Sequence, residues 1–430
     1  MPRIFMLNFT GTHQVQFQAR TFATDGSYRL AVVGSGPAGL FTCASLLRRL
    51  PSTKFDVFDS SPVPFGLIRY GVAPDHQEVK NCTRIFDKMF ESHRDRISLF
   101  CNVRIGSDLT VNELTKFYDA VLLSYGGHQP RRLVIPGATA TNVISGSEFV
   151  SWYNGVPNAK APLLDDPNAV IIGNGNVALD CARILSTVKS LRSTDVPSDV
   201  LVMLEGSQVK NIKIIGRRGA EDVSFTIKEL REQFKLSGWN TTVEMDEEEV
   251  EKLKTRLPFM DRRKKRLMKA NIYYNIVLNK HTGCSEEISC GLLIYSIGYE
   301  MTVLDGIPVN NKGMISLRNG NRVDMPCGSL VYAVGWCARG PRGVIVDTQQ
   351  ESIAVADQIA SDLSKKANVA DSLEDVRQIL DVKGVPYITW DDWKKLDNLE
   401  LKKGAEMGKI REKILDINGF FQDYGQIPRK

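Results

Sequence analysis

The fold is decided by two glycine-rich stretches, Gly34-Ser35-Gly36-Pro37-Ala38-Gly39 and Gly173-Asn174-Gly175-Asn176-Val177-Ala178, in a chain of 430 residues. Each follows an apolar run typical of a buried strand, at residues 30–33 and 169–172, and each opens a helical pattern. Glycines in this context permit a tight turn, let the backbone approach a pyrophosphate and leave helix N-terminal amides pointing at it. A single glycine cluster is often only a turn, but two in the same context predict an α/β fold with two Rossmann-like dinucleotide-binding domains.

The two motifs differ in the residue that is expected to meet the ribose. Asp59 ends an apolar stretch twenty residues after Gly39, where a carboxylate can accept hydrogen bonds from an unphosphorylated adenosine ribose. The strand candidate after the second motif, residues 212–215, leads instead into Arg217 and Arg218. Because guanidinium groups bind phosphate through paired hydrogen bonds, these side chains suit a 2′-phosphate. The sequence therefore predicts FAD at the first site and NADPH at the second.

Composition and cysteine spacing exclude several other classes of protein. The 55 basic and 50 acidic residues are too evenly balanced for a bulk nucleic-acid binder. The eight cysteines form no C-x-x-C pair and no zinc-ligand spacing, so we expect no metal site and interpret them as reduced core residues. No apolar run approaches the roughly 18 residues of a membrane-spanning helix.

The first 24 residues differ in composition from the rest. They include Arg3 and Arg20, and no acidic residue precedes Asp25, a pattern typical of an organellar transit peptide; an unstructured start is the alternative. Strand and helix patterns return at residues 330–334 and 349–363, so the NADP-binding domain is expected to be inserted within the FAD-binding domain. The expected order is a transit peptide at 1–24, the first segment of the FAD-binding domain at 25–128, the NADP-binding domain at 129–300, and the second segment of the FAD-binding domain with the C-terminal region at 301–430.

Four longer stretches resemble the adrenodoxin-reductase family, the mitochondrial NADPH–ferredoxin reductases. They are residues 63–76 (VPFGLIRYGVAPDH), 175–180 (GNVALD), 225–232 (FTIKELRE) and 335–345 (GWCARGPRGVI). The similarity extends from about residue 28 to about residue 415. It implies a glutathione-reductase-like arrangement of the two domains, and the activity of an NADPH:ferredoxin (adrenodoxin) oxidoreductase in the mitochondrial matrix.

The resemblance also implies cofactor contacts at individual positions. For FAD, in addition to the motif glycines Gly34, Gly36 and Gly39, these are Ala38, Asp59, Leu67, Val103, Trp336, Gly343, Val344 and Ile345. For NADP they are Asn174, Gly175, Asn176, Val177, Arg217, Arg218, Glu229 and again Gly343. A tryptophan such as Trp336 is more often a core residue, but its place in a Gly/Arg/Pro turn favours a wall of the flavin site.

The implied reaction links a two-electron donor to a one-electron acceptor. NADPH gives up a hydride, whereas a [2Fe-2S] ferredoxin accepts one electron at a time, and a flavin can mediate between them. The resemblance places His76 and Asp180 near the flavin ring, which makes the pair a candidate proton relay. The alternatives are a structural imidazole for His76 and a carboxylate favoured by the helix dipole for Asp180.

The densest basic cluster runs from Arg262 to Arg266. It follows an acidic run at residues 246–249, so some of the pattern is typical of helices with early acids and late bases. The resemblance places docking of an acidic [2Fe-2S] ferredoxin at Arg262 and Arg266, where opposite charge would attract the partner. A nuclear-localisation signal is the alternative, and it conflicts with the transit peptide. We expect a monomer that lacks a transmembrane segment, binds no nucleic acid and can associate peripherally with the inner mitochondrial membrane.

Between Lys269 and Gly291 the chain is shorter than the family pattern by several tens of residues, so the NADP-binding domain is expected to be shortened near 270–290. One alternative is therefore a flavin- and nucleotide-binding scaffold with impaired reductase activity. A disulfide reductase would need a cysteine pair beside the flavin, which the cysteine spacing does not provide. A flavin monooxygenase stays open, because an oxygen-activating pocket has no sequence signature.

Overall fold

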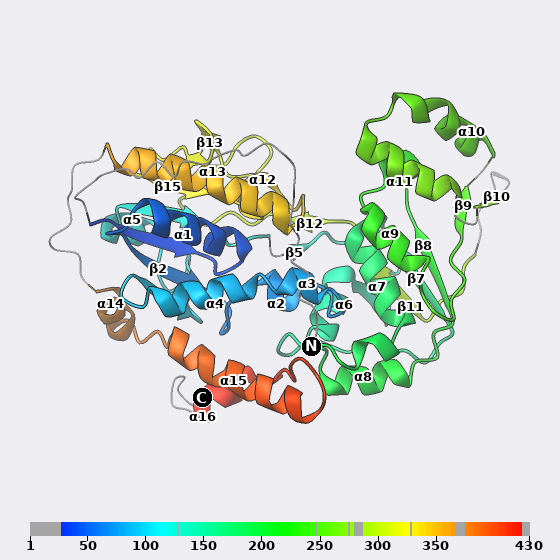
Figure 1. Cartoon of the computed structure of the whole chain (residues 1–430), viewed down its shortest axis with the longest axis horizontal. Coiled ribbons are helices and arrows are strands. Elements are labelled where there is room, and N and C mark those ends of the chain that lie inside the picture. The colour runs from blue at the N-terminus through cyan, green and yellow to red at the C-terminus, as the bar shows by residue number, and fades with distance from the viewer. Residues whose placement is uncertain are drawn as a thin grey trace, which may run out of the picture.

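The computed structural model describes residues 27–127, 129–217, 219–245, 247–273, 276–278, 287–326, 329–365 and 375–423. The predicted transit peptide at 1–24 and the predicted site residue Arg218 lie outside these ranges. The described chain forms a larger body at the left of Figure 1 and a smaller body at the right, each built on its own sheet. Within the described ranges, no helix is both long and apolar enough to cross a membrane.

The larger body is built on a seven-stranded sheet with the order β13-β14-β15-β4-β1-β2-β3. Its strands are β1 (Arg29–Val33), β2 (Lys54–Asp59), β3 (Ile97–Cys101), β4 (Ala120–Leu123), β13 (Leu317–Arg318), β14 (Arg322–Val323) and β15 (Val331–Ala333). Strand β15 pairs parallel with β4, whereas β13 and β14 add an antiparallel edge. The last third of the chain thus completes a sheet that the first third begins.

Two helices distant in sequence pack together on this sheet (Figure 1): α1 (Pro37–Arg49) and α13 (Ile345–Leu363). The Ser352 hydroxyl donates a hydrogen bond to the Ala38 carbonyl oxygen at 3.1 Å, so the first turns of α13 lie beside the start of α1. Both helices bury apolar side chains in one core, among them Leu40 and Val355. The remaining helices of this body are α2 (Leu67–Tyr70), α3 (Gln77–Lys80), α4 (Thr83–Ser92), α5 (Val111–Phe117), α12 (Trp336–Arg339), α14 (Val376–Val382), α15 (Trp390–Glu406) and α16 (Ile417–Asp423).

The smaller body contains a four-stranded parallel sheet with the order β6-β11-β7-β8. Its strands are β6 (Val143–Ser145), β7 (Asn168–Ile172), β8 (Asn211–Ile215) and β11 (Leu292–Tyr295). Its helices are α6 (Gly146–Tyr153), α7 (Asn176–Ser186), α8 (Ser198–Glu205) and α9 (Ile227–Gln233), with 3-10 turns η1 (Lys189–Leu191) and η2 (Ala220–Asp222). Two Rossmann-like units, the second inserted in the first, confirm the predicted fold class.

The chain crosses between the bodies through two paired segments, β5 (Gln129–Pro130) and β12 (Tyr299–Glu300), which are antiparallel. A small helical unit extends the smaller body at the top right of Figure 1. It contains α10 (Glu247–Arg256), η3 (Leu257–Phe259) and α11 (Arg262–Tyr273), and β9 (Val243–Met245) pairs with β10 (Ile276–Leu278). In the stretch predicted to be shortened, β10 closely follows α11, and residues 279–286 lie outside the described ranges.

Candidate functional site

The first glycine motif forms the turn between β1 and α1. A Cβ on Gly34 would lie 2.6 Å from the Ser124 carbonyl oxygen, and one on Gly39 would lie 2.4 Å from the Gly34 carbonyl oxygen, so packing excludes side chains at both positions. A Cβ on Gly36 would meet no atom within 4 Å. Gly36 is the N-cap of α1, whose first turn holds no acidic side chain. The open side of the motif therefore presents helix N-terminal amides, the arrangement that binds a pyrophosphate.

The second motif has the same construction between β7 and α7. A Cβ on Gly173 would lie 2.2 Å from a backbone carbonyl oxygen, whereas one on Gly175 would meet nothing within 4 Å. Ala178 is fully buried, which accounts for a small residue at the third position. Asn176 and Val177 lie in the first turn of α7, and this turn contains no acidic side chain. The two glycine turns, each with the helix N-terminus that follows it, thus have equivalent geometry suited to an anion. We call them the first and the second cradle.

Each cradle is tied to the strand that carries the expected ribose partner. The amides of Gly34 and Gly173 donate to carbonyl oxygens at the ends of β2 and β8, at 2.7 and 2.8 Å. Asp59 is the last residue of β2, and Arg217 lies just beyond the end of β8 with its side chain exposed. Asp59 and Arg217 therefore lie near the corresponding strand ends, one and two residues after the bonded carbonyl, and carry opposite charge.

The carboxylate of Asp59 is fixed by local hydrogen bonds. One oxygen accepts from the Ser35 amide at 2.8 Å and from the Ser35 hydroxyl, and the other accepts from the Ser61 amide at 2.9 Å. The amide of Val103, which is buried, donates to the Asp59 carbonyl oxygen at 2.9 Å. Asp59 and Val103 thus lie together beside the first cradle.

A turn from the C-terminal region of the chain closes over the start of α1. Gly335 has a φ of +76°, and a Cβ there would lie 2.7 Å from the Ala38 Cβ. Its amide donates to Glu351 at 3.2 Å. Trp336 begins α12, and its ring centroid lies 5.7 Å from that of Tyr299. The turn that carries Trp336 is therefore in direct contact with the first motif.

The predicted contacts at Gly343, Val344 and Ile345 lie at the start of α13. Gly343 has a φ of +82°, a backbone conformation that favours glycine, and a Cβ there would lie 2.6 Å from the Arg339 guanidinium, which would have to move. Val344 is the N-cap and Ile345 the first residue of α13. Leu67 opens α2 and, like Val344, is apolar and exposed.

The second cradle is lined by polar groups from the chain that follows β8. The Asn174 carbonyl oxygen accepts from the Ser224 amide at 2.8 Å, and the Asn176 side-chain oxygen accepts from the Thr226 amide at 2.8 Å. Thr226, the N-cap of α9, also donates from its hydroxyl to Glu229 in the first turn of that helix. The structure thus brings Asn174, Asn176 and Glu229 together at this cradle.

The two residues proposed as a proton relay lie in one ionic cluster. His76 Nε2 lies 2.9 Å from an oxygen of Glu232, and no direct hydrogen bond joins His76 to Asp180, both of which the structure describes. Arg183 bridges the group: it binds Asp75 at 2.6 Å and Asp180 at 2.7 Å, and lies 3.4 Å from Glu232. His76 and Asp75 come from the larger body and the other three from the smaller one.

The two aspartates that share Arg183 have pKa values displaced in opposite directions. Burial raises the pKa of Asp180, against the opposing charges of Arg183 and His76. Burial also acts to raise the pKa of Asp75, but the hydrogen bond and charge of Arg183 outweigh it and hold that pKa below its usual range. Asp180 is therefore the carboxylate better suited to take up a proton.

Sequence reasoning did not single out Arg183 or Glu232. Asp180 and Arg183 are three residues apart on α7, a spacing that places both side chains on one helix face and could have indicated the pair. Glu232 lies 156 residues from His76, and no local spacing signals such a contact.

The predicted partner-binding residues, Arg262 and Arg266, are both exposed on α11. A hollow that includes Lys264 of the same helix is lined by Glu221, Arg256, Phe259, Met260, Asp261 and Lys264, but by neither Arg262 nor Arg266. The Phe259 side chain is 89% exposed, a feature that the charge pattern alone did not indicate.

Comparisons with known proteins match the chain to oxidoreductases that use a pyridine nucleotide. The family model described as pyridine nucleotide-disulphide oxidoreductase matches residues 28–358. A relative from Salvelinus fontinalis named "NADPH:adrenodoxin oxidoreductase, mitochondrial" is 35% identical, and the match covers 92% of this chain and 91% of the relative. The relative of the same name from Homo sapiens is 35% identical over 90% of each chain. The chain belongs to the NADPH:adrenodoxin oxidoreductase family.

This family assignment confirms the predicted resemblance and makes the protein an oxidoreductase. The family members are named mitochondrial, in agreement with the predicted organelle. The alignment with the Salvelinus fontinalis relative is 458 positions long, more than the 430 residues of this chain, so it contains family segments that this chain lacks. FprA from Mycobacterium tuberculosis has the same fold, with a TM-score of 0.84 at 29% identity over 92% of this chain and 99% of FprA. A structure of FprA in complex with NADPH gives a TM-score of 0.80.

The cysteines argue against thiol–disulfide chemistry in the described ranges of this family member. Six cysteines lie in those ranges, and all are free. Cys337 adjoins Trp336 in the turn over α1, where burial raises its pKa to about 12. Because the thiolate is the reactive form, this thiol is inert at neutral pH.

Proposed function

We propose that the protein transfers a hydride from NADPH to FAD and then passes single electrons to a [2Fe-2S] ferredoxin. The observation that carries the proposal is the pair of equivalent cradles with residues of opposite charge at the adjoining strand ends, Asp59 at one and Arg217 at the other. A carboxylate accepts hydrogen bonds from a free ribose, whereas a guanidinium binds a 2′-phosphate. FAD therefore fits the first cradle and NADPH the second.

The residues of each cradle fit their cofactor. In both motifs the second glycine faces open space at a helix N-terminus, where a pyrophosphate would be held by backbone amides. Trp336 and the start of α13 would flank the flavin ring, and Asn174, Asn176 and Glu229 would line the NADPH site. When bound, the flavin supplies the capacity to accept a hydride and to release electrons one at a time. The protein itself orients the two cofactors and limits access of water.

We assign proton handling to His76 and Asp180. Both belong to the ionic cluster between the bodies, and the raised pKa of Asp180 favours proton uptake there. Glu232 orients the imidazole through its 2.9 Å contact with His76 Nε2. This arrangement would hold a proton near the flavin site as the charge of the flavin changes.

The proposed ferredoxin-binding surface is the exposed basic face of α11 with Arg262 and Arg266. Opposite charge would steer an acidic ferredoxin to this face, and salt would weaken the complex. We further propose that the protein is a monomer of the mitochondrial matrix that can associate peripherally with the inner membrane.

The test is an anaerobic titration of the purified yellow protein, first with NADPH and then with an oxidised, acidic [2Fe-2S] ferredoxin. We expect NADPH to bleach the flavin absorbance and ferredoxin to restore it. A flavin that NADPH does not bleach would identify a nucleotide-binding scaffold, consistent with the shortened NADP-binding domain. A flavin that is bleached but restored only by oxygen would favour a monooxygenase-type reaction over ferredoxin reduction.

A further inference from the structure

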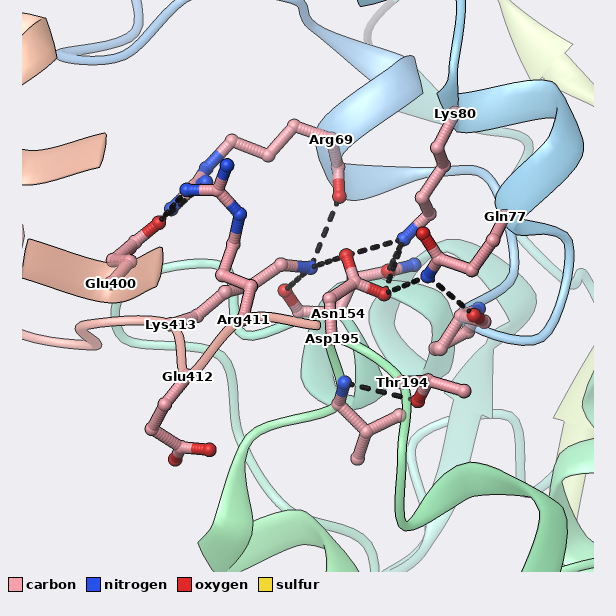
Figure 2. A network of polar contacts seen from close by, with 12 residues as sticks. Arg69, Gln77, Lys80, Asn154, Thr194, Asp195, Glu400, Arg411, Glu412 and Lys413 are labelled. Atoms are coloured by element: carbon pink, nitrogen blue, oxygen red, sulfur yellow. Dashed lines mark hydrogen bonds and ion pairs between the residues drawn. The ribbon is translucent and has the colours of Figure 1, made fainter. Parts of the chain in front are cut away.

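A buried group of charges joins three chain segments at the boundary between the two bodies (Figure 2). Asp195, which precedes α8, accepts from Lys80 Nζ at 2.7 Å, from Gln77 Nε2 at 2.9 Å and from Lys413 Nζ at 3.1 Å. Gln77 and Lys80 belong to α3 of the larger body, and Lys413 follows α15. We call these four residues the junction cluster. The side chains of Lys80, Asp195 and Lys413 are all buried, so solvent does not weaken their interactions.

Backbone groups hold Lys413, the C-terminal residue of the cluster, and the segment around it. Lys413 Nζ also donates to the Asn154 carbonyl oxygen at 2.9 Å and to the Arg69 carbonyl oxygen at 3.2 Å. A few residues earlier, the Ile410 amide donates to the Ser193 carbonyl oxygen at 3.1 Å. The segment after α15 therefore lies across the boundary and bonds to both bodies.

The junction cluster is connected directly to the ionic cluster that contains His76. His76 is the N-cap residue of α3, so it immediately precedes Gln77. The Gln77 side chain donates both to Asp195 and to the Pro74 carbonyl oxygen, at 2.9 and 2.7 Å. Asp195 thus reaches the loop of residues 74–76 through one side chain. Arg183 binds the same loop at a second point, through Asp75.

We propose that Asp195 is a positioning residue for hydride transfer. It clamps the loop of residues 74–76 in the larger body to the smaller body, and so fixes the distance and orientation between the two nucleotide sites. Arg183 and Asp195 both belong to the smaller body, so the loop is bonded to that body at two points. Two points of attachment fix the orientation of the loop as well as its distance, and hydride transfer requires both. The inference rests on the proposed reaction between NADPH and FAD.

The charge of Asp195 stabilises the charged forms of the two buried lysines that face it, Lys80 and Lys413. Burial acts to raise the pKa of Asp195, but the charges of Lys413 and Lys80 outweigh it and hold the pKa well below its usual range. Burial lowers the pKa of Lys413 to about 7 despite Asp195, and the charges of Lys80 and Arg69 add to the effect. Without the carboxylate, burial would favour the neutral forms of Lys80 and Lys413, and α3 would lose its ion pair with the smaller body.

The experiment compares variants of the FAD-loaded enzyme by stopped-flow reduction of the flavin with saturating NADPH. Asp195→Asn should slow flavin reduction roughly tenfold, because a small displacement of the reacting groups is enough to do so. Binding of NADP and the FAD content should not change. Asp195→Glu keeps the charge and should recover most of the rate. Gln77→Ala removes only the link to the loop and should show a smaller loss, which also decides the matter if Asp195→Asn does not fold.

Asp397→Asn is the matched control. Asp397 is equally buried and pairs with Arg411 at 2.5 Å and with Lys394, but no direct contact within the described ranges joins it to the junction cluster or to residues 74–76. We expect this variant to reduce its flavin at the wild-type rate. Wild-type rates in both Asp195→Asn and Gln77→Ala would overturn the proposal, as would equal losses in Asp195→Asn and Asp397→Asn.

A parallel His76→Gln variant separates this proposal from the proton relay. If His76→Gln keeps the wild-type pH profile of flavin reduction while Asp195→Asn slows it, the relay is wrong and the clamp stands. If His76→Gln alters the profile while Asp195→Asn and Gln77→Ala keep wild-type rates, the clamp is wrong and the relay stands. A wild-type flavin that NADPH cannot reduce would refute the proposed function itself, before any variant is compared.

Discussion

Asp59 and Arg217 show how one side chain can distinguish two otherwise equivalent sites. Asp59 ends, and Arg217 follows, a strand that is hydrogen-bonded to the first glycine of its motif. The Asp59 carboxylate accepts hydrogen bonds from the amides of Ser35 and Ser61, whereas the Arg217 side chain is exposed. A fixed acceptor suits the ribose of a tightly held cofactor. An exposed guanidinium suits a substrate that must enter and leave in each turnover.

Replacing Arg217 should therefore change the choice of nucleotide. We expect Arg217→Leu to raise the KM for NADPH roughly tenfold or more, because a charge-assisted hydrogen bond to the 2′-phosphate is lost. The KM for NADH should change little. Steady-state ferricyanide reduction with each nucleotide measures both values. Arg192→Leu, at an exposed arginine of the same domain paired with Glu205, is the control and should resemble the wild type. An equal rise for NADPH and NADH would contradict a role in binding the 2′-phosphate.

The N-termini of α1 and α7 are the elements that convert the fold into binding sites. Each helix starts at a glycine whose missing side chain leaves its amides open, and neither first turn contains an acidic residue that would repel an anion. The neighbouring first glycines differ, since Cβ atoms there would collide with backbone. Substitutions at the two kinds of glycine should therefore have separable consequences.

Gly36→Val and Gly175→Val should each block one cradle and leave the fold intact. A Cβ at either position would meet no protein atom within 4 Å, and the backbone there has ordinary negative φ values. We expect Gly36→Val to be purified with little FAD, and Gly175→Val to be yellow but poorly bleached by NADPH. Absorbance spectra and NADPH titrations measure this, and each variant is the control for the other. Gly34→Val should instead lower the yield of folded protein, because its Cβ would lie 2.6 Å from a carbonyl oxygen. Loss of both cofactors in Gly175→Val would show that the two cradles are not independent.

At the scale of the whole molecule, local features were predictable and contacts between the bodies were not. The glycine motifs and the position of Asp59 follow from short-range backbone geometry, so spacing along the chain was sufficient. The contacts of His76 with Glu232 and of Lys80 with Asp195 join residues 156 and 115 positions apart. No periodicity connects such residues, because only the packing of the two bodies brings them together. The family resemblance placed His76 and Asp180 at the site, but not the residues that orient them.

The ferredoxin-binding proposal also belongs to the whole molecule, because it depends on where charge lies on the surface. Arg266 is exposed on α11, near the top of Figure 1, whereas Lys402 is exposed on α15 at the bottom. We expect Arg266→Glu to lower kcat/KM for ferredoxin-dependent cytochrome c reduction about tenfold at low salt, because like charges would then face each other.

Three comparisons decide whether this effect is electrostatic docking. Ferricyanide reduction by NADPH should be unchanged in Arg266→Glu, since that small acceptor needs no protein surface. Lys402→Glu carries the same change of charge and should behave as the wild type. The defect of Arg266→Glu should shrink as salt is raised toward 1 M, where the screening length falls to about 3 Å. Equal loss of both activities would instead indicate misfolding, and a defect that is independent of salt would assign Arg266 a contact that does not depend on its charge.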